Sequence, residues 1–198
     1  MIAYKGFTKD LWSRLGDGKE ENCKFTLGET KTVSESKTVR SGFHCCENPF
    51  DCLTYYPMNG DNRYFKVEAA GDIDEDESQR IACTSITLLE ELSPARFAAE
   101  AMKYMIMHPH REGWQQSSGM VMVEKNESEA HEENSIAIAR GIRPMVKGPC
   151  ESLLGLLVEN EMGEIINAKL IKVDQRKANK WLYLTDEREV EFVEESKS

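Results

Sequence analysis

The stretch from Ser41 to Lys66 constrains the fold most, because aromatic, cysteine and turn residues are densest there. The apolar run from Phe43 to Cys46 predicts a short strand. Asn48 followed by a proline is a typical helix start, since an N-cap side chain and a proline at the first helical position both favour one. Pro57 would end this helix. After an Asn-Gly-Asp turn, the alternating pattern that begins at Arg63 predicts a second strand.

Further strands are expected on both sides of this stretch. Alternating or β-branched segments predict them at Ala3–Phe7, Cys23–Leu27, Tyr64–Ala70 and Ile81–Leu89. The polar segment Glu29–Val39 is expected to be an exposed loop or an edge strand. Together these elements predict an N-terminal mixed α+β module over residues 1–92.

Ser93 and Pro94 predict the start of a long helix that ends near Met107. Apolar residues recur at helical spacing along it, namely Phe97, Ala98, Ala101, Met102, Met105 and Ile106. Such a stripe either packs into the core or binds a partner, because methionines adapt to partner surfaces, and core packing is the favoured interpretation. The charged segment Glu124–Asn134 is expected to be weakly ordered. Residues 93–134 are therefore predicted to form a connecting amphipathic helix and an acidic linker.

The C-terminal part is predicted to be β-rich. Leu153–Glu159 and Ile165–Val173 flank an Asn-Glu-Met-Gly turn, and Trp181–Leu184 and Val190–Val193 flank a second turn. Both arrangements are typical of hairpins. The predicted fold class is α+β, with a mostly antiparallel β module over residues 135–198.

Two segments carry a resemblance to a known family. Ala3–Phe7 reads Ala-Tyr-Lys-Gly-Phe, and Ser41–Pro57 follows Ser-Gly-Phe-His-x-Cys-Glu-x-Pro-x-Asp-Cys-x-x-Tyr-Tyr-Pro. The chain thereby resembles a family of prophage- and phage-encoded proteins of unknown function. Members of that family often continue into repeats suggestive of a β-solenoid, and Asn134–Gly141 looks like one such rung, while Leu153–Val193 resembles their finishing β module. The resemblance implies a mobile-element origin and no particular activity.

Acidic residues outnumber basic ones by 35 to 25, which gives a net charge of −10. They gather in three blocks, 72–77, 124–133 and 186–195. Such blocks either keep a protein in solution or imitate nucleic acid for a basic partner, and direct binding of DNA or RNA is disfavoured because it relies on Lys and Arg. The predicted partner-binding residues are Asp72, Asp74, Glu75, Asp76, Glu77, Glu129, Glu132 and Glu133.

Metal and thiol chemistry are not expected. His44, Cys45, Cys46 and Cys52 are close in sequence, but neighbouring residues on a strand point to opposite faces, and nothing completes a set of four ligands. Unpaired cysteine spacing in a chain expected to be cytosolic does not indicate a disulfide framework. We therefore predict buried, reduced cysteines, with no metal, no cofactor and no catalytic residue.

One enzymatic alternative rests on the order of residues. Lys5-Gly6, Gly42-Phe43-His44 and Tyr55-Tyr56 resemble the ADP-ribosyltransferase-like fold, in which a basic residue, a Gly-aromatic strand and a Tyr-bearing helix cradle a nicotinamide nucleotide. Glu68 or Glu91 would be the late acid. Lys5 departs from the Arg or His of such enzymes, so a non-catalytic version is favoured.

The sequence therefore predicts a phage- or mobile-element-encoded acidic binding protein that inhibits a host nucleic-acid-handling defence machine, in the manner of an anti-CRISPR protein. Its partner would be a host protein with a basic nucleic-acid-binding surface, such as a CRISPR effector. The inhibitor would bind this surface by electrostatic complementarity or would block the partner sterically. The alternatives are an ADP-ribosyltransferase-like enzyme acting on a host target and a phage accessory or scaffolding protein.

A cytoplasmic location without membrane contact is expected. The chain has no run of about 18 apolar residues, which a membrane helix requires. The N-terminal segment is too short and too polar for a signal peptide. The oligomeric state is left open.

Overall fold

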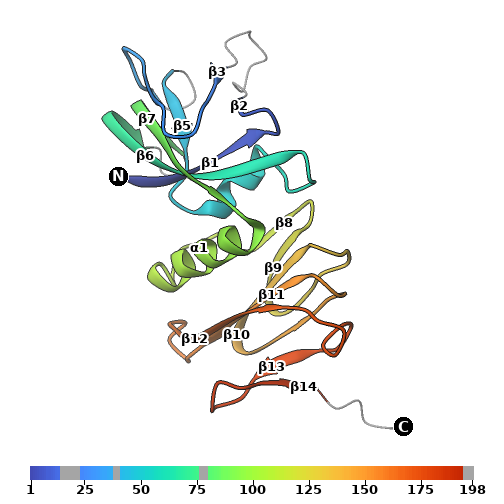
Figure 1. Cartoon of the computed structure of the whole chain (residues 1–198). Coiled ribbons are helices and arrows are strands. Elements are labelled where there is room, and N and C mark those ends of the chain that lie inside the picture. The colour runs from blue at the N-terminus through green and yellow to red at the C-terminus, as the bar shows by residue number, and fades with distance from the viewer. Residues whose placement is uncertain (14–22, 38–40, 76–79, 194–198) are drawn as a thin grey trace. The chain divides into compact units, whose positions relative to one another are not determined.

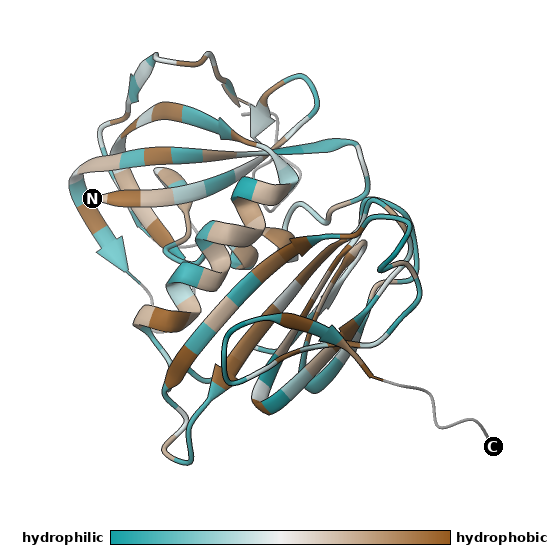
Figure 2. Ribbon diagram, turned by 60° about the horizontal axis from the view of Figure 1, so that its bottom comes forward, coloured by the Kyte–Doolittle hydropathy of each residue, from teal (hydrophilic) through white to brown (hydrophobic). Residues whose placement is uncertain are grey.

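A computed structural model describes residues 1–13, 23–37, 41–75 and 80–193. The chain divides into two compact units, Met1–Phe97 and Ala98–Ser198 (Figure 1). Both units are built mainly from strands, and the described residues contain one α-helix. The fold is thus mostly β. Hydrophobic residues line the strands of both units, whereas hydrophilic residues occupy most of the connecting loops (Figure 2).

The first unit is an antiparallel sheet that closes on itself. Its elements are β1 (Ile2–Thr8), β2 (Trp12–Ser13), β3 (Cys23–Lys24), β4 (Thr30–Thr32), β5 (Phe43–Cys45), the 3-10 helix η1 (Pro49–Thr54), β6 (Asn62–Glu75) and β7 (Ile81–Leu92). β1 pairs with β6, β6 with β7, and β7 with both β4 and β5. Tyr4 and Cys46 then exchange two backbone hydrogen bonds of 2.7 and 2.8 Å, which join the end of β5 to β1. β1, β6, β7 and β5 therefore form a small barrel.

Aromatic residues fill the barrel. The ring of Phe7 lies 5.0 Å from that of Phe25 and 5.5 Å from that of Phe65, measured between centroids. Because strand residues alternate between faces, Ala3, Lys5 and Phe7 of β1 share the interior face. The opposite face of β1 lies against η1.

The predicted short helix is present as η1. The Asn48 side chain caps it by accepting a hydrogen bond of 3.2 Å from the backbone N–H of Phe50, and Pro49 occupies its first turn. After η1, the ring of Tyr56 packs directly on Gly6, where a Cβ atom would lie 2.6 Å from a ring carbon. A glycine is therefore required at this position of β1 for η1 to sit close.

The helix α1 (Pro94–Met107) begins where the sequence predicts, with Ser93 Oγ accepting a 3.3 Å hydrogen bond from the N–H of Arg96. The predicted core stripe is confirmed for most of its members, since Phe97, Ala98, Ala101, Met102 and Met105 are buried. Ile106 is 41% exposed and is the exception. No helix among the described residues has the length and apolar composition needed to cross a membrane.

The second unit contains seven strands, β8 (Gln116–Ser118), β9 (Val121–Glu129), β10 (Ile136–Lys147), β11 (Leu153–Glu159), β12 (Ile165–Lys172), β13 (Leu182–Leu184) and β14 (Val190–Phe192). Both predicted hairpins are confirmed, because β11 pairs with β12 and β13 with β14 in antiparallel fashion. The prediction of a mostly antiparallel module is wrong at its centre, where β9, β10 and β11 pair in parallel.

This parallel stack also corrects the expected linker. β9 continues through Glu129, within the segment predicted to be weakly ordered. Val121, Ile136 and Leu153 lie at equivalent positions of the three parallel strands, as in successive rungs of a solenoid. The apolar face that β9 contributes could not be seen from its charged composition, because only alternate residues of a strand turn inward.

The parallel strands turn a corner at one point. The register of β9 and β10 shifts between Arg140 and Met145. Asn126 adopts a φ of 68° at this corner. A Cβ atom added to Gly141 would lie only 2.4 Å from Asn126 Oδ1. The asparagine side chain thus lies against the backbone of the next strand. Beyond the corner, β13 joins β10 at Val146.

Small and aliphatic residues form the core of the second unit. Ala137, Ala139, Leu154, Leu156 and Val146 belong to one buried cluster, which also takes in residues from β12 and β13. Ile138 lies on the opposite face of β10, where Met102 of α1 contacts the Gly155 position. The first part of β10 and most of β11 are therefore buried on both faces, which explains the nearly continuous apolar sequence of residues 136–139 and 153–157.

Candidate functional site

The predicted acidic residues of the first unit lie at the end of β6. Asp72 and Glu75 are exposed and Asp74 is half-buried, whereas Asp76 and Glu77 lie outside the described residues. The backbone of Asp72 is held by two contacts. Its N–H donates to Thr84 Oγ1 over 2.8 Å, and its carbonyl accepts from Ser36 Oγ over 3.0 Å. These contacts accompany a bulge between Ala70 and Ile73.

The bulge depends on a glycine. Gly71 adopts a φ of 77°, and a Cβ atom at this position would lie 2.1 Å from Thr84 Oγ1. The strand therefore needs glycine to let Thr84 approach the backbone of Asp72. Past the bulge, the pairing with β7 resumes at Ile73, and the consecutive residues Asp74 and Glu75 point to opposite faces of β6.

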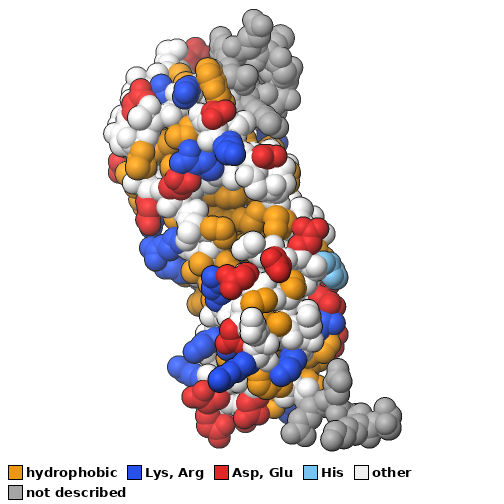
Figure 3. All heavy atoms as spheres, turned by 45° about the vertical axis from the view of Figure 1, so that its right-hand side comes forward, with side chains coloured by type: hydrophobic (Ala, Val, Ile, Leu, Met, Phe, Trp, Pro, Cys, Tyr) orange, Lys and Arg blue, Asp and Glu red, His pale blue; other side chains and the backbone are white. Residues whose placement is uncertain are grey.

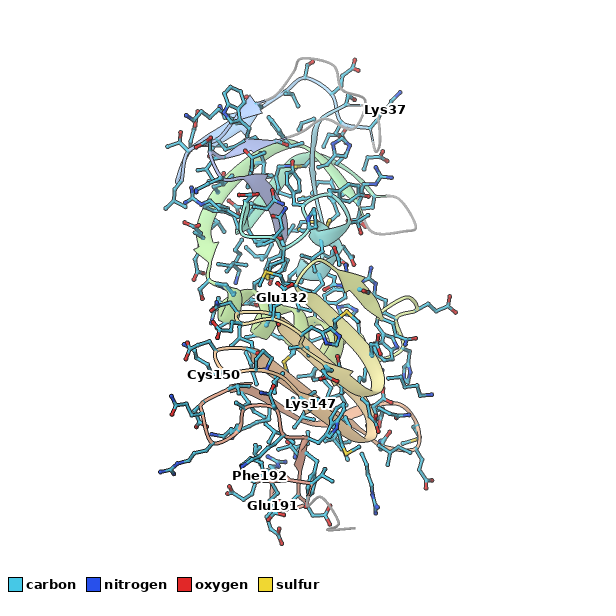
Figure 4. The ribbon with its side chains drawn as sticks, turned by 90° about the vertical axis from the view of Figure 1, so that its right-hand side faces the viewer. Lys37, Glu132, Lys147, Cys150, Glu191 and Phe192 are labelled. Carbon is cyan, nitrogen blue, oxygen red and sulfur yellow. The ribbon has the colours of Figure 1, made fainter. Side chains whose placement is uncertain are left out.

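The predicted acidic residues of the second unit follow β9. Glu129 forms an ion pair with Lys147 of β10 at 2.8 Å, so its charge is partly compensated. Glu132 and Glu133 are exposed in the loop before β10, and the Glu132 carbonyl accepts a hydrogen bond from Ser135 Oγ. Figure 4 labels Glu132 and Lys147 among the side chains of this unit. The two predicted acidic sets thus belong to different units.

Exposed carboxylates are more widespread than the predicted set. Glu68 on β6, Glu90 on β7 and Glu124 and Glu127 on β9 are also exposed. In the view of Figure 3, acidic and basic side chains are interspersed on the surface of both units. Strand alternation was the sequence signal that could have identified Glu68 as exposed, because Glu68 lies between the buried residues Val67 and Ala69.

The strongest single acid–base contact on the first unit lies elsewhere. Arg63 of β6 donates two hydrogen bonds of 2.6 Å to the carboxylate of Glu91 on β7. The hydrogen bond from Arg63 is the main reason why the pKa of Glu91 is lowered. Glu91 is therefore neutralised by a partner, which counts against its suggested role as a late catalytic acid.

Residues of the enzymatic alternative come together but are used for packing. Lys5 is buried, and its amine donates a 2.6 Å hydrogen bond to the carbonyl oxygen of His44. Tyr56 is buried on Gly6. Nucleotide binding by these residues stays a prediction. Within the described residues, no group of three His, Cys, Asp or Glu side chains could hold a metal ion.

Four cysteines are buried in the first unit, two of them, Cys45 and Cys83, in the core of the barrel. Cys45, Cys46, Cys52 and Cys83 are buried as free thiols. The Cys83 thiol donates a 3.5 Å hydrogen bond to the carbonyl oxygen of Phe43. The neighbouring thiols Cys45 and Cys83 shift each other's pKa, and burial together with the Cys46 thiol raises the pKa of Cys52. The sequence gives no sign that Cys83 belongs to this group, because it is 38 residues from Cys45 and only the pairing of β5 with β7 brings the two together.

A buried arginine is the most polar feature inside the second unit. Arg140 lies on β10 and is 3% exposed. Its Nε donates to Glu159, and its Nη2 donates to the carbonyls of Pro109 and Gly163, the latter over 3.3 Å. Its guanidinium carbon lies 4.8 Å from the ring centroid of Trp114. The sequence signal that could have identified this buried arginine is its position directly after the apolar run Ile-Ala-Ile-Ala.

A comparison with protein families matches residues 1–100 to a domain of unknown function, DUF7666. The match covers just over half of the chain. The chain belongs to the DUF7666 family. The DUF7666 region contains the complete barrel, η1 and the first half of α1, and hence the Arg63–Glu91 pair and all four buried thiols. Neither the curated proteins nor the solved structures contain a significant match.

Only one of the two candidate acidic sets lies within the region matched to DUF7666. Asp72, Asp74 and Glu75 lie within the family domain, whereas Glu129, Glu132 and Glu133 lie beyond it. The parallel stack and its buried arginine belong to the part of the chain that the family match leaves out.

Proposed function

We propose that this protein is a non-enzymatic, acidic binding protein encoded by a phage or another mobile element. It inhibits a host nucleic-acid-handling defence machine, such as a CRISPR effector, by occupying a basic surface that otherwise holds nucleic acid. The observation that supports this proposal is the exposed acidic end of β6, where Asp72 and Glu75 are exposed and the backbone of Asp72 is held by Thr84 and Ser36.

Fixed carboxylates suit such a role for a physical reason. A basic groove binds a regular array of phosphates, and a protein competes best when its charges need no ordering on binding. The bulge after Ala70 and the two hydrogen bonds to Asp72 supply that order on β6. The net charge of −10 adds long-range attraction toward a basic partner.

The second acidic set is a weaker contributor. Glu129 is paired with Lys147, so only Glu132 and Glu133 offer uncompensated charge in that loop. The mobile-element origin rests on the resemblance carried by Ala3–Phe7 and Ser41–Pro57. The family domain has no assigned activity, which leaves a binding role open to direct test.

The test is a pull-down from bacterial lysate with nuclease treatment and elution by a salt gradient, followed by mass spectrometry. We expect a basic nucleic-acid-binding protein that elutes as the salt rises. The variant Asp72→Lys/Asp74→Lys/Glu75→Lys should lose it. The control Glu161→Lys/Asp186→Lys/Glu187→Lys reverses three exposed acids elsewhere and should retain it.

Two outcomes would contradict the proposal. Equal binding by the reversed variant and the control would show that the acidic end of β6 does not contact the partner. Stable self-association without any host protein would favour the scaffolding alternative.

A further inference from the structure

The register of β5 on β7 places two cysteines on one interior face of the barrel. Phe43 lies opposite Cys83, and Cys45 lies opposite Ile81, so the two cysteines occupy diagonal positions two residues apart. Residues opposite each other in an antiparallel pair share a face, and diagonal neighbours on that face lie about 7–8 Å apart, so a disulfide between them requires some movement of the backbone. Both thiols belong to the barrel core, with 2% exposure for Cys45 and none for Cys83.

A buried amine accompanies the two thiols. Lys5 lies between Ala3 and Phe7 on the interior face of β1, and the bridge between Tyr4 and Cys46 brings β1 alongside the end of β5. The amine donates its hydrogen bond to the carbonyl of His44, the residue before Cys45. A positive charge in this interior favours a neighbouring thiolate.

The two thiols are not equivalent. The hydrogen bond from Cys45 lowers the pKa of Cys83, and the charge of Lys5 adds to this effect. The same hydrogen bond, together with burial, raises the pKa of Cys45 well above its usual range. Cys83 is therefore the thiol that more readily becomes the nucleophile, and Cys45 is the proton donor beside it.

We propose that Cys45 and Cys83 form a peroxide-sensitive thiol pair that closes to a disulfide inside the barrel. The sulfur of Cys83 attacks one oxygen of hydrogen peroxide, the O–O bond breaks, and the departing hydroxide takes up the thiol proton as water. The sulfur of Cys45 then attacks the sulfenic acid, the S–O bond breaks, and the second water leaves with the Cys45 proton. Two thiols and one peroxide give one disulfide and two waters.

Peroxide reaches the pair through local opening of β5. This strand has three residues, and Phe43 and His44 are only half-buried. Short strands with few pairing partners open at a lower free energy than the whole fold. Once closed, the disulfide would cross-link β5 to β7 and remove that opening.

The test is peptide mapping of the full chain after hydrogen peroxide treatment and alkylation. Tryptic cleavage places Cys83 in peptide 81–96 and Cys45, Cys46 and Cys52 in peptide 41–63. We expect these two peptides to be joined, with two of the six cysteines protected from alkylation. A disulfide confined to peptide 41–63, or reduced Cys83 after treatment, would overturn the proposal.

Four variants sharpen the result. Cys45→Ala should leave Cys83 as a sulfenic acid that dimedone captures, whereas Cys46→Ala should still form the cross-link. Lys5→Met should slow the oxidation on the order of tenfold by lowering the thiolate fraction, and Lys31→Met, on β4, should not. An unchanged oxidation rate in folded Lys5→Met would show that the amine has no part in the mechanism. The wild-type peptide map shows whether the disulfide forms, even where a variant fails to fold.

Discussion

Single residues of the first unit are stabilised by partners that lie far away in sequence. Arg63 and Glu91 are 28 residues apart and form a two-pronged ion pair because β6 and β7 pair in register. Both side chains are partly exposed, at 36% and 45%, so solvent screens the pair. The contribution of this ion pair to the free energy of unfolding is therefore modest, and it depends on pH.

The first prediction concerns this pair. Since the pKa of Glu91 is lowered in the folded state, its contribution is present above the unfolded pKa of about 4.5 and is lost as the pH falls through the folded value. We expect Glu91→Gln to reduce the free energy of unfolding by about 0.5 kcal/mol at neutral pH. Urea midpoints should differ at pH 7 and converge near pH 2. An equal loss for Glu90→Gln would show that general charge, not the pair, is responsible.

The second prediction concerns the contact between Gly6 and Tyr56. Because an added Cβ would lie 2.6 Å from the tyrosine ring, Gly6→Ala should cost about 1–3 kcal/mol of unfolding free energy. The cost should vanish in a Tyr56→Ala background, as a double-mutant cycle by chemical denaturation would reveal. Additive effects of the two substitutions would contradict the proposed clash.

At the scale of elements, β10 organises the second unit. It pairs with β9, β11 and β13, and it carries Arg140, which ties the segment after α1 to the hairpin of β11 and β12. Within the described residues, Arg140 Nη1 is buried without a hydrogen-bond partner, so the guanidinium contributes through its Nε and Nη2 contacts. Removing Arg140 or Glu159 leaves the other charge unpaired.

The third prediction follows from that arrangement. Arg140→Met should lower the free energy of unfolding of the second unit by about 3–5 kcal/mol, because Glu159 would remain without its partner. Arg140→Met/Glu159→Met should recover part of the loss. Arg140→Lys should not substitute, since an ammonium lacks the planar array of donors. Urea unfolding monitored by circular dichroism measures all three, and a lysine variant of native stability would refute the account.

At the scale of the whole molecule, the boundary between the two units falls inside α1. The unit boundary follows Phe97, and the family match ends at residue 100, whereas the sequence predicts a module that ends at residue 92. The difference has a physical cause. The ring of Phe97 stacks on Tyr64 at 4.1 Å and lies 5.2 Å from the ring of Phe50, so the first turn of α1 completes the core of the first unit.

The fourth prediction distinguishes the two ends of this helix. Phe97→Ala should destabilise the first unit by about 3–5 kcal/mol, and Met102→Ala should destabilise the second by about 2–5 kcal/mol. Hydrogen exchange should therefore quicken in β1 and β6 for the former and in β10 and β11 for the latter. The control Met107→Ala removes a side chain that is 65% exposed and should change neither. The same exchange pattern in both core variants would contradict this division of the helix.

Local patterns alone determined much of this protein. The capped start of η1, the start of α1 with its buried stripe, and both C-terminal hairpins follow from nearby residues, because caps, turns and periodicity act over a few positions. Only the tertiary structure decided the closure of the barrel, the parallel pairing of β9, β10 and β11, and the meeting of Cys45 with Cys83. These features depend on contacts between distant segments, and alternation shows which face of a strand is buried without showing which strand lies beside it.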